Sequence, residues 1–306
     1  MDFASVEKAR AAYREKLKSC RIATLIIAAV IAFIGMALTS AGTGEAAFMV
    51  LIFFFVFNAV IALFIASLLT GKEAGEYRKA YKAYFIEQNM RKIFTNLDYH
   101  HDQGLSRQAV AATGMINTGD VYSSNDFTSG KYKDVDFTQA DAHIQTVHTD
   151  SDGNTYYTTI FKGRIMLFEF PKKFNFNLEL ISRKFHPYRI PKSTNGRKMT
   201  KIHTESSEFN RIFKIYGEDG FEAFYILDPA FMVKMQAIAE AHKSKILFGF
   251  TNNQLVIALN DGNDSFEPPK SRKPLDEQAE LNRVSSDLKT ITDFVDQLSL
   301  DRKLFK

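Results

Sequence analysis

Two long apolar runs near the N-terminus constrain this chain more than any other feature. Ile22 to Leu38 contains no charged residue, and neither does Ala46 to Gly71; the short segment between them carries one charge, Glu45. A helix needs about 20 apolar residues to cross a bilayer, and only helices or closed barrels satisfy their backbone hydrogen bonds in lipid. Because neither run alternates polar and apolar residues, the sequence predicts a transmembrane hairpin with spans at about 22–40 and 47–69.

The charges that flank these runs predict the orientation of the hairpin. Residues 1–21 carry six Lys and Arg side chains and residues 72–95 carry another six, whereas the segment between the runs has none. Lys and Arg collect on the cytoplasmic side of membrane proteins. The sequence therefore predicts a multi-pass protein with both termini in the cytoplasm and the lipid bilayer as its integral partner. A cleaved signal peptide is disfavoured, because the basic segment before the first run is long for that purpose.

Length and composition limit what the rest of the chain can be. The chain has 306 residues, which leaves room for one domain of roughly 200 residues with its own core. The net charge of +4 is too small to indicate nucleic acid. The single cysteine, Cys20, excludes an intrachain disulfide and any zinc site built from several cysteines. We expect a reduced, cytoplasmic domain, with no cofactor.

The central region alternates polar and apolar residues in the manner of β-strands. Phe174, Phe176 and Leu178 show the pattern, and an Asp-Gly turn between Asp141–Thr149 and Tyr156–Lys162 indicates a β-hairpin. The sequence thus predicts a mixed, mainly antiparallel α+β domain. Further strands are predicted at 131–138, 164–170, 174–181, 209–216, 223–227, 245–250 and 254–259, and helices at 71–95, 106–113 and 229–243.

The last helix, predicted over Leu275–Arg302, is amphipathic. Leu281, Val284, Leu288 and Ile291 begin a heptad-like seam shorter than three full heptads. Packing onto its own domain or onto the preceding stalk helix is the main interpretation, with self-association or a partner helix as the alternative. The predicted segments are a cytoplasmic tail at 1–21, the hairpin at 22–70, a stalk helix at 71–97, the α+β domain at 98–265, and a linker with the C-terminal helix at 266–306.

Several motifs of the strand-and-turn kind follow the two apolar runs. They are Gly130-Lys131-Tyr132 ahead of Val135 and Phe137, Phe161-Lys162-Gly163, then Phe209, Phe213 and Tyr216, Tyr225-Ile226-Leu227 ahead of Pro229 and Met232, and Phe250, Asn253, Leu255 and Ile257-Ala258. With these features the chain resembles a family of bacterial membrane proteins that carry the domain of unknown function numbered 3137. The resemblance covers roughly residues 20–265 and implies a bacterial inner membrane, but no reaction and no catalytic residues.

A basic stretch is the strongest candidate for function. No acidic residue lies between Ile181 and Thr204, and Lys or Arg beside an anionic bilayer contributes about 1 kcal/mol each. The open interpretations are a solvated loop, contact with anionic lipid, an acidic protein partner, and, last, nucleic acid. The residues are Arg183, Lys184, Arg189, Lys192, Arg197, Lys198 and Lys201.

Other motifs give weaker indications of a functional site. Asp150 and Asp152 resemble the start of a calcium loop, but the required Gly and Glu positions hold Thr155 and Phe161, which favours a hairpin turn. Polar residues at 261–264 are interpreted as loop solvation, and the histidines have no metal-site spacing. Two hypotheses follow: a membrane-anchored binding or scaffold module, or a membrane-bound hydrolase whose site the sequence does not reveal.

Overall fold

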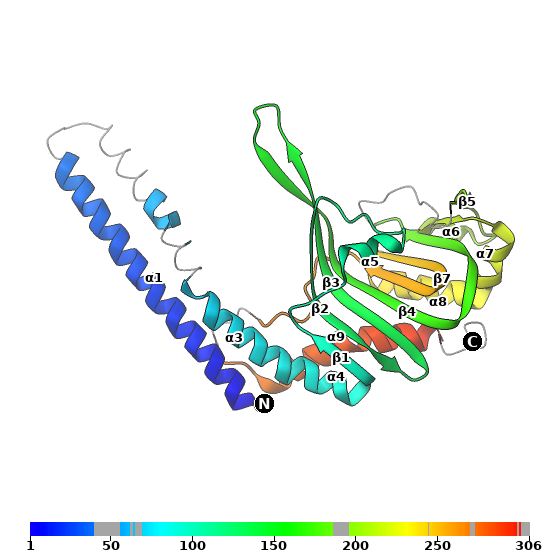
Figure 1. Cartoon of the computed structure of the whole chain (residues 1–306), viewed down its shortest axis with the longest axis horizontal. Helices are drawn as coiled ribbons and strands as arrows, with labels where there is room; N and C mark the ends of the chain where they lie inside the picture. Colours follow the sequence, from blue (N-terminus) through cyan, green and yellow to red (C-terminus); the bar gives the residue numbers. More distant parts are fainter. Residues whose placement is uncertain are drawn as a thin grey trace. The chain divides into compact units, whose positions relative to one another are not determined.

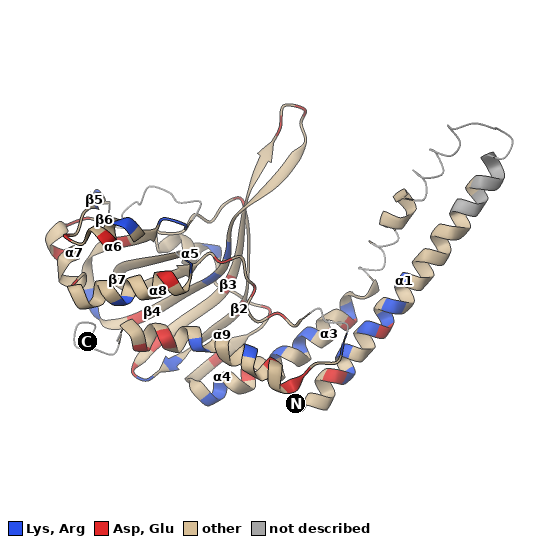
Figure 2. Cartoon of the chain, turned by 180° about the vertical axis from the view of Figure 1, so that it is seen from behind, with Lys and Arg blue, Asp and Glu red and all other residues tan. Residues whose placement is uncertain are grey.

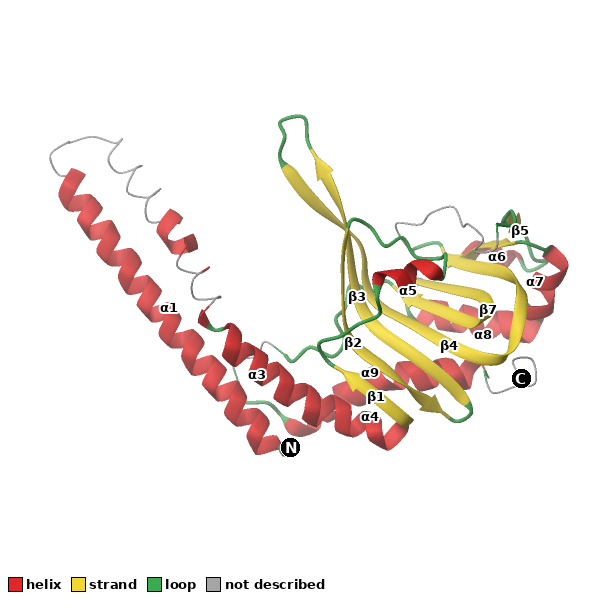
Figure 3. Cartoon of the chain, in the orientation of Figure 1, coloured by secondary structure: helices red, strands yellow, loops and turns green. Residues whose placement is uncertain are grey.

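The computed structural model describes residues 1–39, 56–61, 64, 69–185, 196–243, 245–269, 273–298 and 300. The chain forms two compact units. The first comprises Met1–Ile86 with Pro268–Leu281, and the second comprises Glu87–Glu267 with Asn282–Lys306. We call them the N-terminal unit and the sheet unit, and Figures 1 and 3 show their elements.

The N-terminal unit corrects the membrane prediction. Among the described residues, none of the helices combines the length and the apolar character that crossing a bilayer requires. The predicted transmembrane hairpin, the multi-pass inner-membrane location and the bilayer as integral partner are therefore wrong on this finding. Most of the second predicted span, 47–69, lies outside the described residues.

The first predicted span is part of a longer helix. The run from Ile22 is the second half of α1 (Phe3–Thr39), and the first half of that helix is charged and pairs with another helix. Tyr13 stacks on Tyr77 of α3 (Gly71–Tyr81) at 6.2 Å between ring centroids. A hydropathy profile divides this segment into a charged part and an apolar part, although the backbone forms one continuous helix through both.

The aromatic stripe after the apolar runs is core of the N-terminal unit. Tyr77, Tyr81 and Phe85 are buried, across α3 and the following π-helical segment η1 (Lys82–Glu87). The Tyr81 hydroxyl donates to Glu280 Oε2 at 2.5 Å, so the stripe binds the segment at 268–281.

The sheet unit contains a seven-stranded antiparallel sheet with the order β1-β2-β3-β4-β6-β5, and β7 also pairs with β4. Strand β4 is long enough to pair with three neighbours and joins both ends of the sheet (Figure 1). The strands are β1 (Thr95–His100), β2 (Val121–Tyr132), β3 (Val135–Thr149), β4 (Thr155–Ser182), β5 (Thr200–Ile202), β6 (Phe213–Gly217) and β7 (Ile246–Leu259).

Helices cover both faces of the sheet. Helix α5 lies on one face, where Val110 packs in a core cluster with Ile144 and Val256, and α8 and α9 lie on the other (Figures 1 and 3). The α9 seam residues Val284, Leu288 and Ile291 are buried, so the helix packs on its own chain, as the main interpretation held. The helices that follow η1 are α4 (Gln88–Ile93), α5 (Arg107–Ala112), α6 (Ser207–Ile212), α7 (Gly220–Ile226), α8 (Pro229–Ala241) and α9 (Glu277–Leu298).

Local capping explains where the predictions of elements succeed and fail. The Asp228 side chain caps α8 by accepting the Phe231 N–H at 2.9 Å, as predicted. The strand predicted at 223–227 is wrong: residues 223–226 belong to helix α7, because Asp219 accepts the Phe221 N–H at 2.7 Å and starts the helix. Strand β1 was not predicted. The predicted hairpin at 245–259 is one bent strand, β7, with positive φ at Asn252.

Gly163 provides a test of the sheet. Its φ is +154°, and a Cβ atom there would lie 2.0 Å from the Leu259 carbonyl oxygen of the paired strand. Because the atoms that the new Cβ would meet belong to the Leu259 backbone, Gly163→Ala should lower the free energy of unfolding by roughly 3 kcal/mol. Urea denaturation monitored by circular dichroism measures this loss. Gly153→Ala, where φ is +84° but no atom lies within 4 Å, should cost only about 1 to 2 kcal/mol. Equal losses in the two variants would contradict the backbone clash.

Candidate functional site

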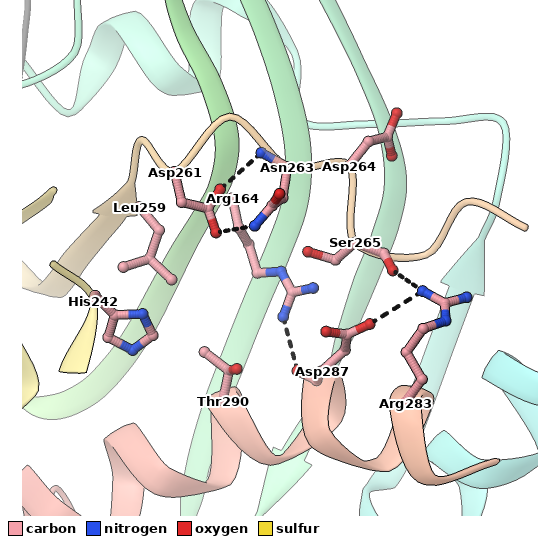
Figure 4. Close-up of a pocket in the computed structure, with 10 residues that line it drawn as sticks. All are labelled: Arg164, His242, Leu259, Asp261, Asn263, Asp264, Ser265, Arg283, Asp287 and Thr290. Carbon is pink, nitrogen blue, oxygen red and sulfur yellow. Dashed lines mark hydrogen bonds and ion pairs between the residues drawn. The ribbon is translucent and has the colours of Figure 1, made fainter. Parts of the chain in front are cut away.

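A polar pocket lies on the face of the sheet that α8 and α9 cover. Its cavity volume is about 240 Å³. Four elements form it: β4, the end of α8, the loop that follows β7, and α9 (Figure 4). The lining residues are Arg164, His242, Leu259, Asp261, Asn263, Asp264, Ser265, Arg283, Asp287 and Thr290.

A buried ion pair forms the base of this pocket. Arg164 Nε lies 3.6 Å from Asp141 Oδ1, and both side chains are about 95% buried, at 4% and 5% exposure. Arg164 Nη1 donates to the Asp287 carbonyl oxygen of α9 at 3.1 Å, and its guanidinium lies 4.7 Å from the centroid of the Phe266 ring. Asp141 Oδ2 accepts the Ser265 N–H at 3.0 Å. The pair thus joins two strands, the loop and the helix.

This ion pair is only partly satisfied. Asp141 Oδ1 and Arg164 Nη2 are buried and have no hydrogen-bond partner, and each such group costs about 1 to 3 kcal/mol. Burial raises the pKa of Asp141 to about 6, against the opposing effect of Arg164, and the nearby charges of Asp126 and Asp264 add to the rise. The site therefore holds electrostatic free energy that a bound group could release.

The loop after β7 is held rigidly over the pair. Asp261 accepts hydrogen bonds from the backbone and side-chain nitrogens of Asn263, at 3.0 and 2.9 Å. Arg283 of α9 donates to the carbonyl oxygens of Ser265 and Glu267 at 3.3 and 3.2 Å. Asp261, Asn263 and Asp264 were interpreted from sequence as loop solvation, and all three line the pocket.

Three carboxylates gather beside the pocket. The oxygens of Asp126, Asp264 and Glu267 lie within 4.8 Å of one another, a spacing that a divalent cation could bridge. Asp126 is buried and already accepts hydrogen bonds from the Tyr99 hydroxyl at 2.6 Å and from Asn125 Nδ2 at 2.8 Å. Burial, together with the Asp126 charge, raises the pKa of Tyr99. The group belongs to a hydrogen-bond network of the fold, and we assign no metal to it.

The tips of β3 and β4 form a two-stranded ribbon that projects from the sheet (Figure 1). Strand β2 stops pairing with β3 at Gln145, and β7 begins to pair with β4 only at Arg164. The predicted Asp-Gly turn closes the ribbon: Asp150 Oδ1 accepts the N–H groups of Asp152 and Asn154 at 3.0 and 2.8 Å. The hairpin interpretation of this segment is thus confirmed.

Two of the basic residues predicted as a contact surface form contacts within the fold. Arg183 donates to the carbonyl oxygens of Arg211 and Asn210 at 2.6 and 3.2 Å, and Arg197 lies 3.9 Å from Glu218. Both are therefore engaged within the fold. Lys184, Lys198 and Lys201 are exposed, whereas Arg189 and Lys192 lie outside the described residues. Contact of these residues with lipid or a partner stays a prediction. Figure 2 shows the distribution of charge.

The pocket itself escaped sequence reasoning. Arg164 lies in a β-strand and Asp287 on a helix that begins more than a hundred residues later, so no short spacing joins them. One signal was available: Arg164 comes directly before the apolar run Ile165–Phe168, and a charge inside a buried strand needs a partner.

Comparisons with known proteins identify a domain but no activity. The model of the family described as Protein of unknown function (DUF3137) matches residues 159–300, which confirms the resemblance found in the sequence. No curated protein matches the chain. Among solved structures, the chain is similar to the crystal structure of the mycobacterial trehalose monomycolate transport factor A, TtfA, at 10% identity and a TM-score of 0.40, covering 75% of this chain and 96% of that one.

The raised pKa of Asp141 predicts a pH dependence of stability. Between its unfolded pKa, near 3.8, and its folded pKa, about 6, the folded state holds a proton that the unfolded state releases. This stabilisation is present below pH 4 and is lost as the pH rises through 6. The free energy of unfolding of wild type should therefore fall, relative to Asp141→Asn, by up to about 3 kcal/mol from pH 4 to 7. Urea denaturation of both proteins measures it, and a constant difference would contradict the shift.

Proposed function

We propose that this chain, whose residues 159–300 match the DUF3137 family, is a protein-binding module that receives an extended segment of a partner as an added β-strand. The observation that carries the proposal is the projecting ribbon with its unpaired β4 edge. A strand edge presents a row of unpaired N–H and C=O groups, and strand addition is a common mode of peptide recognition.

The two edges of the ribbon differ. On the β3 edge, Asp120 Oδ2 accepts the Val147 N–H at 2.8 Å and occupies part of the ladder. On the β4 edge, Asn260 Nδ2 donates to the Ile160 carbonyl oxygen at 3.4 Å. Between that residue and the turn, residues 155–159 pair only with β3 among the described strands. The open edge is therefore the five-residue stretch of β4.

The side chains of this edge specify the partner. Residues 154–161 carry no charge, and Tyr156 and Tyr157 are 53% and 59% exposed. Natural proteins usually protect such an edge with Lys, Pro or a covering element, and a lone two-stranded hairpin is marginally stable in water. Asp150 and Asp152 lie at the tip. We therefore expect an uncharged partner strand rich in β-branched and aromatic residues, with a Lys or Arg beside the tip.

The alternative function, a hydrolase, requires a nucleophile and a base in contact with each other. Ser265, His242 and Asp261 line the same pocket. However, no hydrogen bond joins His242 to Ser265 among the described contacts, and Figure 4 shows the two side chains on opposite sides of the Arg164 guanidinium. A nucleophile needs its base within hydrogen-bond reach. The arrangement supports binding over acyl transfer.

Selection from a displayed library of random short peptides tests the proposal on the full chain. Selected peptides should alternate β-branched or aromatic residues, lack proline, and slow amide hydrogen exchange at residues 155–159, because they complete the ladder. Tyr156→Lys with Tyr157→Lys should weaken their binding by about tenfold or more.

The matched control places the same charges on another exposed surface, with Gln108→Lys and Ala112→Lys on α5, and should leave binding unchanged. Peptides that bind both double variants equally, or that protect amides elsewhere, would overturn the proposal. Concentration-dependent dimers that the tyrosine substitutions abolish would assign the edge to a second copy of the chain and would also overturn it.

A further inference from the structure

A patch of exposed aromatic side chains lies on helix α7. Phe221, Phe224 and Tyr225 are 86%, 47% and 58% exposed. Residues three and four positions apart are neighbours on one side of a helix, so the three rings lie together. Phe is among the residues that proteins bury most often, and contiguous exposed apolar groups indicate an interaction site. We call these three residues the aromatic patch.

The fold does not need the aromatic patch for its core. The other side of α7 packs on the domain through Ala223 and Ile226, which have no exposed surface. The start of the helix is fixed by Asp219, whose side chain accepts the Phe221 N–H at 2.7 Å. Position and packing of α7 are therefore secured without the three exposed rings.

Basic side chains lie beside the aromatic patch. The Lys172 Nζ atom lies 3.2 Å from the Tyr225 hydroxyl oxygen and 4.7 Å from the centroid of the Tyr225 ring. Lys173, the next residue, is exposed. One edge of the patch thus carries two ammonium groups.

A second basic segment reaches the same end of the sheet. Arg197 Nη1 donates to the Asn175 carbonyl oxygen at 3.3 Å and lies 3.9 Å from Glu218, which comes three residues before Phe221. Both views of the chain accordingly show β5 and α7 at this end (Figures 1 and 2). Lys198, which follows Arg197, is exposed and adds a further positive charge.

The acidic side chains of this region are engaged within the fold. The Glu218 side chain is only 1% exposed, and one carboxylate oxygen of Glu222 is buried. Asp219 and Asp228 cap α7 and α8 through backbone N–H groups. The lysines beside the patch, by contrast, form no ion pair with the residues that the structure describes. The charge that this surface presents to a partner is therefore positive.

We propose that the aromatic patch and its lysines make peripheral contact with the surface of an anionic lipid bilayer. The rings enter the boundary between headgroups and acyl chains, and the ammonium groups meet the lipid phosphates. Aromatic rings with adjacent Lys or Arg are the composition of interfacial anchors, and each Lys near an anionic bilayer adds to the attraction.

The exposure of Phe221 favours lipid over an acidic protein partner. A projecting ring needs a fitted pocket on a protein, whereas a bilayer interface accepts it anywhere on its surface. No helix crosses the bilayer in this contact. The contact is separate from the ribbon and does not depend on the proposed strand addition, so Tyr156→Lys with Tyr157→Lys should leave it unchanged.

A fluorescent reporter tests the proposal on the full chain, which contains no tryptophan. In Phe221→Trp, vesicles of phosphatidylcholine with phosphatidylglycerol should shift the emission to shorter wavelength, and lipids brominated on their acyl chains should quench it. Vesicles of phosphatidylcholine alone should be about tenfold less effective, because the attraction of the lysines is lost. Tyr156→Trp, at an exposed ring of the ribbon, is the control and should show neither change.

Charge variants test the lysines in the Phe221→Trp chain. Lys172→Gln with Lys173→Gln should raise the lipid concentration at the half-maximal shift about tenfold or more. Lys92→Gln with Lys289→Gln makes the same change of charge at exposed positions of α4 and α9 and should leave that concentration unchanged. Circular dichroism verifies that both double variants fold.

Several results would overturn the proposal. They are a reporter that vesicles leave unchanged, equal quenching at position 156, and equal effects of the two lysine pairs. A shift that appears without lipid and grows with protein concentration would assign the patch to a second copy of the chain. A response to a peptide rich in Glu and Leu, but not to vesicles, would assign it to an acidic protein. Either assignment would also overturn the lipid contact.

Discussion

The buried ion pair between Asp141 and Arg164 connects the parts of the sheet unit. It joins β3 to β4 directly, reaches α9 through the Asp287 carbonyl oxygen, and holds the loop after β7 through the Ser265 N–H. Two charges removed from water are costly unless other hydrogen bonds complete them. Here Asp141 Oδ1 and Arg164 Nη2 have no hydrogen-bond partner, and a polar pocket lies beside the pair.

Strand β4 sets the positions of both candidate sites. Its middle, from Arg164, pairs with β3 and β7 and carries the guanidinium into the pocket. Its beginning extends past the end of β7 and forms one side of the ribbon. A single strand of 28 residues thus reaches from a covered polar pocket to an uncovered edge.

Sequence reasoning succeeded where the signal was local. The helices predicted at 106–113 and 229–243, the Asp-Gly turn and the apolar seam of α9 each depend on residues within a few positions of one another. It failed where the extent of a helix or the pairing of strands determines the structure. The apolar run at Ile22 belongs to a helix that begins at Phe3, and β7 stays one strand through Asn252 because β4 pairs along both of its halves.

The sequence by itself determined the α+β character of the chain, its antiparallel strands, the buried face of the last helix and the family of residues 159–300. Only the tertiary structure decided that Asp141, Arg164 and Asp287 meet, and that residues 155–159 pair only with β3 among the described strands. The physical reason is that periodicity reports which side of an element is apolar, whereas partners across a sheet are set by register and by chain connections over more than a hundred residues.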